Sequence, residues 1–292
     1  MGSYDHDLII LGGGSGGYAA ARTAREDGAD VAIVDPGPLG GLCILRGCMP
    51  SKALLASSGI MSHLRRAEEF GIEPVNAQAN LEAIMARKDR LIAEFTEYRV
   101  GQLRTFPLYD GYGRFVSADE IDVDGQRLRA KNFIIATGSV IRHMPIPGLE
   151  EVGYMTSDEA LELRTRPDSM IVLGGGSVAC ELAQFYCRVG VDVTLIQRSH
   201  HILSSVDEDL ARPVETHMRE EGMKVFTGTK LHRFWRDGER RCVSFAHEGQ
   251  DHEIGADVIL QALGRRPNID RLDLEAAGVQ VESQRVLVDK QM

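Results

Sequence analysis

The sequence has few basic residues, few cysteines and no long apolar run, and each shortage excludes a class of protein. Its 292 residues include 33 Lys and Arg against 43 Asp and Glu, a net charge of −10. A nucleic-acid or anionic-membrane partner, which needs a basic surface, is therefore not expected. No apolar run reaches the roughly 18 residues of a transmembrane helix, and the first residues contain no signal-peptide core, so we expect a cytoplasmic protein.

Five cysteines are too few for a structural disulfide framework. The composition is otherwise that of a globular enzyme, with 43% hydrophobic and 26% charged residues, which excludes a disordered chain.

The same local pattern occurs twice, 162 residues apart. Each copy has a short apolar run, a glycine-rich turn, a helix-compatible stretch that ends at a glycine, and a second apolar run. The predicted strands are residues 8–11, 31–34, 170–173 and 193–196, and the predicted helices are residues 18–26 and 180–188. The turns are Gly12-x-Gly14-x-x-Gly17 and Gly174-x-Gly176-x-x-Ala179. A lone glycine motif is explained by an ordinary tight turn, but this repeated context predicts two dinucleotide-binding βαβ units.

The residues at the ends of the second strands distinguish the two predicted sites. Asp35 lies 23 residues after Gly12, where an acid accepts hydrogen bonds from a free ribose 2′-hydroxyl, as in FAD or NAD. The equivalent position after Gly174 is Gln197, followed by Arg198. A neutral residue beside a guanidinium suits a 2′-phosphate, so this site is expected to bind NADP(H). The alternative is that Arg198 is a solvated surface charge.

A close pair of cysteines, Cys43 and Cys48, follows the first repeat with C-x4-C spacing. A zinc site would need a second closely spaced pair, and a disulfide that closes so short a loop stabilises a fold little. The pair is better suited to cycling between dithiol and disulfide. A helix predicted at residues 51–64 would place Cys48 near a helix start, with Lys52 adding positive charge nearby.

The cysteine segment resembles the redox-disulfide motif of the class I flavoprotein disulfide reductases, the group of dihydrolipoamide dehydrogenase, glutathione reductase and mercuric reductase. The matching motifs span nearly the whole chain: Gly40-Gly41-x-Cys43-x4-Cys48-x-Pro50-Ser51-Lys52, Ala136-Thr137-Gly138, Thr156 to Leu161, Gly174 to Glu181, and Gly264-Arg265-Arg266-Pro267-Asn268. Leu42 and Leu45 stand where the family usually has Thr and Asn, so local flavin contacts and the subfamily are left open.

The resemblance implies an α/β protein with two Rossmann-like three-layer domains, the second inserted in the first. Residues 1–148 would form the FAD-binding domain, residues 149–268 the NAD(P)H-binding domain, and residues 269–292 a segment returning to the first. The family continues with a segment that contacts the flavin and a dimerisation domain that supplies a His–Glu pair to the partner's active site. Neither is found here, so we expect a C-terminally truncated chain that lacks the interface of the family's homodimer.

The resemblance also assigns roles to residues. FAD would be held by Gly12, Gly14, Gly17, Asp35, Gly41, Ala136, Thr137 and Gly138, and NADPH, in preference to NADH, by Gly174, Gly176, Ala179, Gln197 and Arg198, with Gly264 among the cofactor-binding residues. Cys48 would face the flavin, Cys43 would be the exposed interchange thiol, and Lys52 and Glu181 would form an ion pair beside flavin and nicotinamide. No metal site is expected.

The implied activity is hydride transfer from NADPH through FAD to the Cys43–Cys48 disulfide, and on to a disulfide or related substrate. The sequence leaves lipoamide, glutathione-type disulfides and Hg(II) open as substrates. Two alternatives also remain: a truncated nucleotide-binding module without disulfide turnover, and a diaphorase-type reductase of quinones or dyes.

The other predictions concern structure. Cys180, Cys187 and Cys242 are expected to be small core residues. Asn80 is expected to cap a helix running through Leu81 and Phe95. Residues 126–138 are predicted as the strand that returns to the first domain, with the crossing to the second near Pro145 and Pro147 and the crossing back at residues 265–272.

Overall fold

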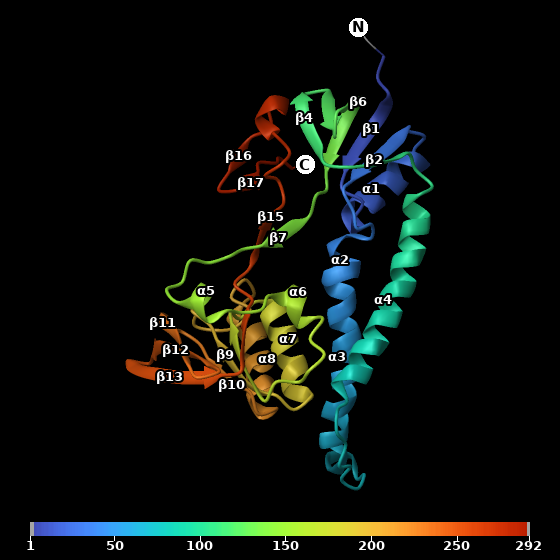
Figure 1. Ribbon diagram of the computed structural model, residues 1–292. Helices are drawn as coiled ribbons and strands as arrows, with labels where there is room; N and C mark the ends of the chain where they lie inside the picture. The colour runs from blue at the N-terminus through green and yellow to red at the C-terminus, as the bar shows by residue number, and fades with distance from the viewer. Residues whose placement is uncertain (1–2, 291–292) are drawn as a thin grey trace. The chain divides into compact units, whose positions relative to one another are not determined.

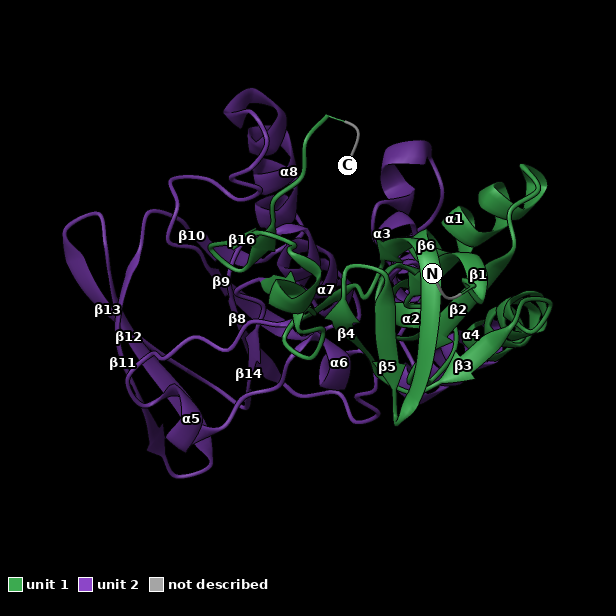
Figure 2. Ribbon diagram, turned by 90° about the horizontal axis from the view of Figure 1, so that it is seen from above, with its two compact units in different colours: residues 1–49, 92–140, 265–292 green, residues 50–91, 141–264 purple. Residues whose placement is uncertain are grey.

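The computed structural model describes residues 3–290 and divides into two compact units, coloured separately in Figure 2. Unit 1 comprises residues 1–49, 92–140 and 265–292, and unit 2 comprises residues 50–91 and 141–264. The chain therefore leaves unit 1 and returns to it, as expected for one domain inserted in another.

Unit 1 is built on a six-stranded sheet of order β3-β2-β1-β6-β5-β4 (Figure 1). Its strands are β1 (His6–Leu11), β2 (Val31–Asp35), β3 (Leu108–Asp110), β4 (Gly113–Ser117), β5 (Glu120–Val123) and β6 (Gln126–Ile135). The first four in this order are parallel, and β6, β5 and β4 form an antiparallel meander. Both faces of β1 are covered, because Ile9 and Leu11 enter one core cluster while Leu8 and Ile10 enter another. A parallel strand buried on both faces has the continuous apolar run that the sequence shows.

The remaining elements of unit 1 follow the sheet strands or return from unit 2. They are α1 (Ser15–Glu26), α2 (Gly41–Arg46), β15 (Arg265–Pro267), η2 (Leu274–Ala277), β16 (Val281–Glu282) and β17 (Arg285–Val286). A further strand, β7 (Ser139–Ile141), runs to the unit boundary and pairs with β15. The predicted strand 126–138 is three residues too long, because β6 ends at Ile135 and residues 136–138 turn away, with Gly138 at a φ of +71°.

Unit 2 contains a four-stranded parallel sheet of order β10-β9-β8-β14 and a three-stranded antiparallel sheet of order β11-β12-β13. The strands are β8 (Ser169–Leu173), β9 (Asp192–Ile196), β10 (Lys224–Phe226), β11 (Lys230–Asp237), β12 (Arg240–His247), β13 (Gln250–Ala256) and β14 (Val258–Gln261). Met170 and Val172 of β8 pack in the cluster that includes the helix after β8, while Ile171 and Leu173 pack with Phe245 of the antiparallel sheet. These layers and those of unit 1 confirm the predicted α/β, Rossmann-like fold class.

The helices of unit 2 are α3 (Cys48–Arg65), η1 (Ala67–Phe70), α4 (Leu81–Leu103), α5 (Leu149–Val152), α6 (Ser157–Ala160), α7 (Ser177–Arg188) and α8 (Glu208–Glu220). Two of them, α3 and α4, cross the unit boundary. The predicted cap of α4 is confirmed, since Asn80 Oδ1 accepts a hydrogen bond of 3.0 Å from the Ala83 backbone N–H. Among residues 3–290, no helix has the length and apolarity needed to span a membrane.

Residues 50–91 lie within the range predicted for FAD binding but pack in unit 2. The physical reason is that Leu54, Leu81 and Met85 are buried in the core around α7. The chain crosses between units at residues 49–50, 91–92, 140–141 and 264–265, and the third crossing precedes the one predicted near Pro145 and Pro147. Which unit binds which nucleotide stays a prediction.

Candidate active site

The first glycine turn, between β1 and α1, is closed by backbone contacts that exclude side chains. A Cβ at Gly12, whose φ is +108°, would lie 2.4 Å from the Ala136 carbonyl oxygen, and one at Gly17 would lie 1.8 Å from the Gly12 carbonyl oxygen. A Cβ at Gly41 would lie 2.4 Å from the Gly14 Cα. In the described part of the chain, Gly14 gives α1 no side-chain cap, so the N–H groups at this helix start can receive an anion.

Asp35 holds this turn from the end of β2. The side chain is buried, at 9% exposure, and its Oδ2 accepts a hydrogen bond of 2.5 Å from the Gly13 backbone N–H. Its Oδ1 accepts one of 2.7 Å from the Gly37 backbone N–H. Each carboxylate oxygen can accept more than one hydrogen bond, so Asp35 can also receive a hydroxyl from a ligand.

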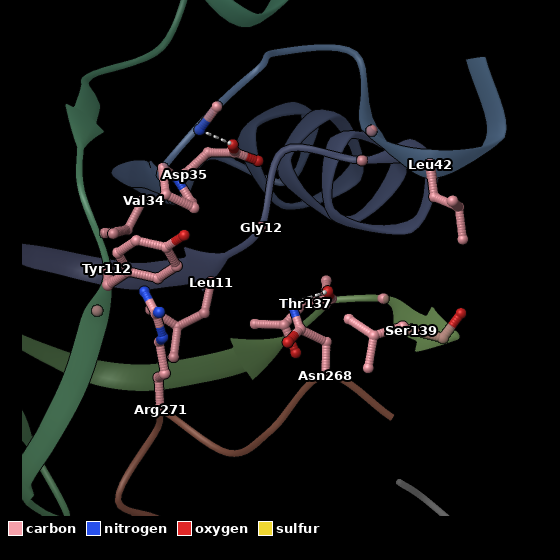
Figure 3. A pocket seen from close by; sticks show the side chains of 18 of the residues that line it. Leu11, Gly12, Val34, Asp35, Leu42, Tyr112, Thr137, Ser139, Asn268 and Arg271 are labelled. Carbon is pink, nitrogen blue, oxygen red and sulfur yellow. Dashed lines mark hydrogen bonds between the residues drawn. The ribbon is translucent and has the colours of Figure 1, made fainter. Parts of the chain in front are cut away.

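A pocket of about 200 Å³ lies beside this turn, entirely within unit 1 (Figure 3). Of the predicted FAD residues, its wall includes Gly12, Gly14, Asp35, Gly41, Ala136, Thr137 and Gly138. Gly17, the remaining predicted FAD residue, and Gly264 are not part of this wall. Gly17 lies beneath the turn, where it lets α1 approach Gly12, and Gly264 lies in unit 2, at the point where the chain returns to unit 1.

The pocket wall also contains Tyr112 and Arg271, which the sequence did not single out, and Asn268 of the Gly264–Asn268 motif. The Arg271 guanidinium lies 4.3 Å from the centre of the Tyr112 ring, a cation–π contact visible in Figure 3. The Asn268 side-chain amide donates a hydrogen bond of 3.3 Å to the Thr137 carbonyl oxygen. The one local signal for Tyr112 is an aromatic residue between two glycines, Gly111 and Gly113.

The second glycine turn, between β8 and α7, repeats these constraints within unit 2. A Cβ at Gly174 would lie 2.6 Å from the Ala262 carbonyl oxygen, whereas one at Gly176 would contact nothing within 4 Å. Ala179 is fully buried. The structure therefore leaves the start of α7 sterically open on the Gly176 side, as an anion site requires.

Gln197 and Arg198 follow β9, beside this turn. The Gln197 side chain covers Gly175, at whose position a Cβ would lie 3.0 Å from the Gln197 Cγ. The Gln197 carbonyl oxygen accepts hydrogen bonds from the Thr229 N–H and hydroxyl at 3.1 and 3.0 Å, which fix the backbone there. Arg198 is exposed, so its guanidinium can reach a ligand.

The two cysteines lie on consecutive helices. Cys43 is within α2 and half-buried, and Cys48 is the first residue of α3 and exposed. The resemblance implies that Cys43 is the exposed thiol, whereas in the structure Cys48 is the more exposed of the two. The roles of the two thiols stay predictions. The position of Cys48 at a helix start agrees with the sequence.

The expected ion pair between Lys52 and Glu181 is present in unit 2. The Lys52 Nζ donates to Glu181 Oε1 at 2.5 Å, and the Ser51 hydroxyl donates to Oε2 at 2.9 Å. The Lys52 side chain is 59% exposed and that of Glu181 28% exposed. Both donors come from the first turns of α3, so this carboxylate connects the helix that begins at Cys48 to α7. The contribution of Ser51 was not predicted.

The other three cysteines are buried, as predicted. Burial raises the pKa of the Cys180 thiol to about 12, and it also raises the pKa values of Cys187 and Cys242. These thiols stay protonated at neutral pH and are unreactive. No group of three His, Cys, Asp or Glu side chains within residues 3–290 is placed to bind a metal ion.

Comparison with known proteins identifies the family. Residues 6–292 match the family model described as pyridine nucleotide-disulphide oxidoreductase, and the chain belongs to this family of oxidoreductases. The resemblance seen in the sequence is thereby confirmed.

Individual relatives give the extent of the similarity. Mercuric reductase of Staphylococcus aureus is 35% identical over 278 residues, 94% of this chain and 51% of the relative. Dihydrolipoyl dehydrogenase of Thermus scotoductus is 38% identical over 284 residues, 95% of this chain and 61% of the relative. The chain thus spans about half to three fifths of the length of these curated relatives.

A solved structure shows the same fold. The HOCl-induced flavoprotein disulfide reductase RclA from Escherichia coli matches with a TM-score of 0.82 and 24% sequence identity, over 98% of this chain and 62% of that chain.

The family's cofactors are FAD and a pyridine nucleotide, and the two glycine turns fit them. Each turn needs glycine for steric reasons, leaves a helix start accessible and has a polar residue at the next strand end. These are the requirements for binding a dinucleotide pyrophosphate and its ribose.

Proposed function

We propose that this chain carries the nucleotide-binding and redox parts of an NADPH-dependent flavoprotein disulfide reductase. It would pass reducing equivalents to the Cys43–Cys48 pair and on to a disulfide or related substrate. The observation that supports this most is the Lys52–Glu181 ion pair. It connects, within unit 2, the helix that begins at the redox cysteine and the helix that follows the second nucleotide turn.

Unit 1 would bind FAD, which when bound supplies the hydride acceptor between the nicotinamide and the disulfide. The start of α1 would bind the pyrophosphate, and Asp35 would accept a ribose hydroxyl. The Tyr112 ring and the Arg271 guanidinium offer a flat surface for an aromatic ring, since both line the same pocket.

Unit 2 would bind NADPH in preference to NADH. The start of α7 at Gly176 would bind the pyrophosphate. No carboxylate stands at the end of β9 to accept the ribose hydroxyls of NADH, and Gln197 and Arg198 occupy this place. A guanidinium forms charge-assisted hydrogen bonds with a phosphate.

Cys48 would be the thiol beside the flavin and Cys43 the interchange thiol. The dipole of α3 favours the thiolate of its first residue, Cys48, and Lys52 follows one turn later. Thiol chemistry of this kind suits a reducing compartment, so we place the protein in the cytoplasm.

The test is spectroscopic. Purified protein supplied with FAD should be yellow, and anaerobic titration with NADPH should bleach the flavin and produce a long-wavelength thiolate-to-flavin band. Cys48→Ser should abolish that band. Protein that takes up no FAD, or whose flavin NADPH does not reduce, would overturn the proposal. A band that survives in Cys48→Ser would overturn the role of Cys48.

A further inference from the structure

A second carboxylate, Glu221, connects the same two helices far from the Lys52–Glu181 pair. Glu221 follows α8, and its side chain is only 8% exposed. Its Oε1 accepts hydrogen bonds from the Ser62 hydroxyl at 3.0 Å and from the Arg188 Nε at 2.7 Å. Its Oε2 accepts one from the Gln184 amide at 2.9 Å. The two carboxylate oxygens of Glu221 therefore accept hydrogen bonds from side chains of both α3 and α7.

The positions of these donors show that one face of each helix is involved. On α3, Ser51 and Ser62 are eleven residues apart, about three turns, so they lie on the same face. On α7, Glu181, Gln184 and Arg188 have the i, i+3, i+7 spacing of a single stripe. Hydrogen bonds to Glu181 and to Glu221 thus connect α3 and α7 at two places along the same pair of helix faces.

The interactions at Glu181 and at Glu221 differ in strength. Lys52 is more than half exposed, and exposed ion pairs hold their partners weakly. Glu221 is buried and accepts charge-assisted hydrogen bonds from Arg188, a stronger arrangement. Burial acts to raise the pKa of Glu221, but its hydrogen bonds with Arg188, Gln184 and Ser62 outweigh burial and lower it. Glu221 is therefore ionised at neutral pH.

We propose that Glu221, acting through Ser62, is a positioning residue that fixes α3 along α7 and thereby holds Lys52 on Glu181. One residue along a helix is 1.5 Å, so a shift of α3 by a single residue would separate Lys52 and Ser51 from the Glu181 carboxylate. This inference rests on the proposed function, in which the Lys52–Glu181 pair serves the redox step.

Ser62→Ala tests the inference with the least disturbance, because it removes the α3 contact and leaves Glu221 bonded to α7. Ser62→Thr keeps the hydroxyl and should behave as the parent protein. Ser57→Ala is the matched control, since within residues 3–290 the Ser57 hydroxyl makes hydrogen bonds of only 3.4 Å, to the Ala53 carbonyl oxygen and from Arg87.

The first measurement is the rate at which NADPH reduces the flavin. Displacement of reacting groups by about 1 Å can slow a reaction up to about a hundredfold, so we expect Ser62→Ala to slow the reduction about tenfold. The KM for NADPH should stay within about twofold, because the turn at Gly176 is untouched. Equal rates in Ser62→Ala and Ser57→Ala would overturn the inference.

The second measurement does not depend on activity. The melting temperatures of Ser62→Ala, Lys52→Met and the double variant form a double-mutant cycle. If Ser62 holds Lys52 in place, the loss in the double variant should be smaller than the sum of the single losses. Additive losses would overturn the inference. Parent protein that binds no FAD would instead contradict the proposed function, and the cycle would still decide whether the two contacts are coupled.

Discussion

The Lys52 ammonium lies 2.5 Å from the Glu181 carboxylate, although the two residues are 129 positions apart in the chain. Ser51 donates to the other oxygen of the same carboxylate. Because Lys52 is in the second turn of α3 and Glu181 in the second turn of α7, the pair connects the starts of the two helices. Both residues of the pair lie in unit 2.

Removal of the ammonium should impair electron transfer much more than stability. In Lys52→Met the Glu181 carboxylate keeps its bond from Ser51, and the positive charge one turn after Cys48 is lost. We expect flavin reduction by NADPH to slow by about tenfold or more, while the free energy of unfolding changes by less than about 1 kcal/mol, since the pair is partly exposed. Stopped-flow absorbance and urea unfolding measure the two effects.

Lys224→Met provides the control for that variant. Lys224 pairs with Asp192 at 2.8 Å on the surface of the same unit, so it should lose a similar small amount of stability without slowing flavin reduction. Equal slowing in both variants would show that the effect is not specific to Lys52.

Local sequence patterns predicted the central strands of both units and the helices after the two glycine turns, but not β3 to β5 or β10 to β14. The two βαβ units could be located because a buried parallel strand, a glycine turn and a helix follow each other within about thirty residues. The Asn80 cap could be predicted for the same reason, because it depends only on residues adjacent in the sequence. The pairing of Lys52 with Glu181 came from the family resemblance, because no spacing rule connects residues so far apart.

Residues that meet through tertiary structure were missed. Tyr112 and Arg271 share a pocket wall only because the chain returns from unit 2 to unit 1. Glu221 is one of many acids in a charged helix end, and only the packing of α3 and α7 makes it a common acceptor. The relative exposure of Cys43 and Cys48 likewise depends on how the α2–α3 turn folds, which the motif does not specify.

Arg198 should determine the preference for NADPH. In Arg198→Ala a 2′-phosphate would lose its charged hydrogen-bond donor, which is worth about 1.5–3 kcal/mol. The KM for NADPH should therefore rise by about 10- to 150-fold, with the KM for NADH unchanged. Steady-state reduction of a dye measures both. Arg212→Ala, on the exposed face of α8, is the control; an unchanged KM for NADPH in Arg198→Ala would show that Arg198 is a solvated surface charge.

Asp35→Asn should weaken FAD binding and destabilise unit 1. The asparagine has one acceptor oxygen, so either the Gly13 or the Gly37 N–H loses its partner and faces an amide donor instead. Such a loss costs about 1–3 kcal/mol. The FAD content after purification and the melting temperature of the apoprotein should both fall. Asp110→Asn changes the exposed residue paired with Asp35 in β3, and should leave both values unchanged; identical losses in the two variants would contradict the assigned role of Asp35.

Glu221 should make the stability of unit 2 depend on pH in the acid range. Its pKa in the folded protein lies below the usual value, because the hydrogen bonds from Arg188, Gln184 and Ser62 outweigh burial. A carboxyl with a lowered folded pKa contributes stability that is complete above its unfolded pKa, about 4.3, and is lost as the pH falls through the folded value. Glu221→Gln removes this contribution, so its destabilisation, about 2 kcal/mol at pH 7, should shrink as the pH falls below the unfolded pKa and toward the lowered folded pKa.

Urea unfolding at a series of pH values measures that difference, with Glu220→Gln as the control. Glu220 is the adjacent acid, 69% exposed, and its ion pair with His217 is long, at 3.6 Å. Its substitution should change stability by less than about 0.5 kcal/mol at every pH. His217 lies 3.6 Å from Glu220 and 3.3 Å from Glu221, so each of the two variants removes one of its carboxylate neighbours. A Glu221→Gln difference that stays constant from pH 7 to pH 3 would mean that the carboxylate is not the source of the stabilisation, and that Glu221 acts only by filling space between the helices.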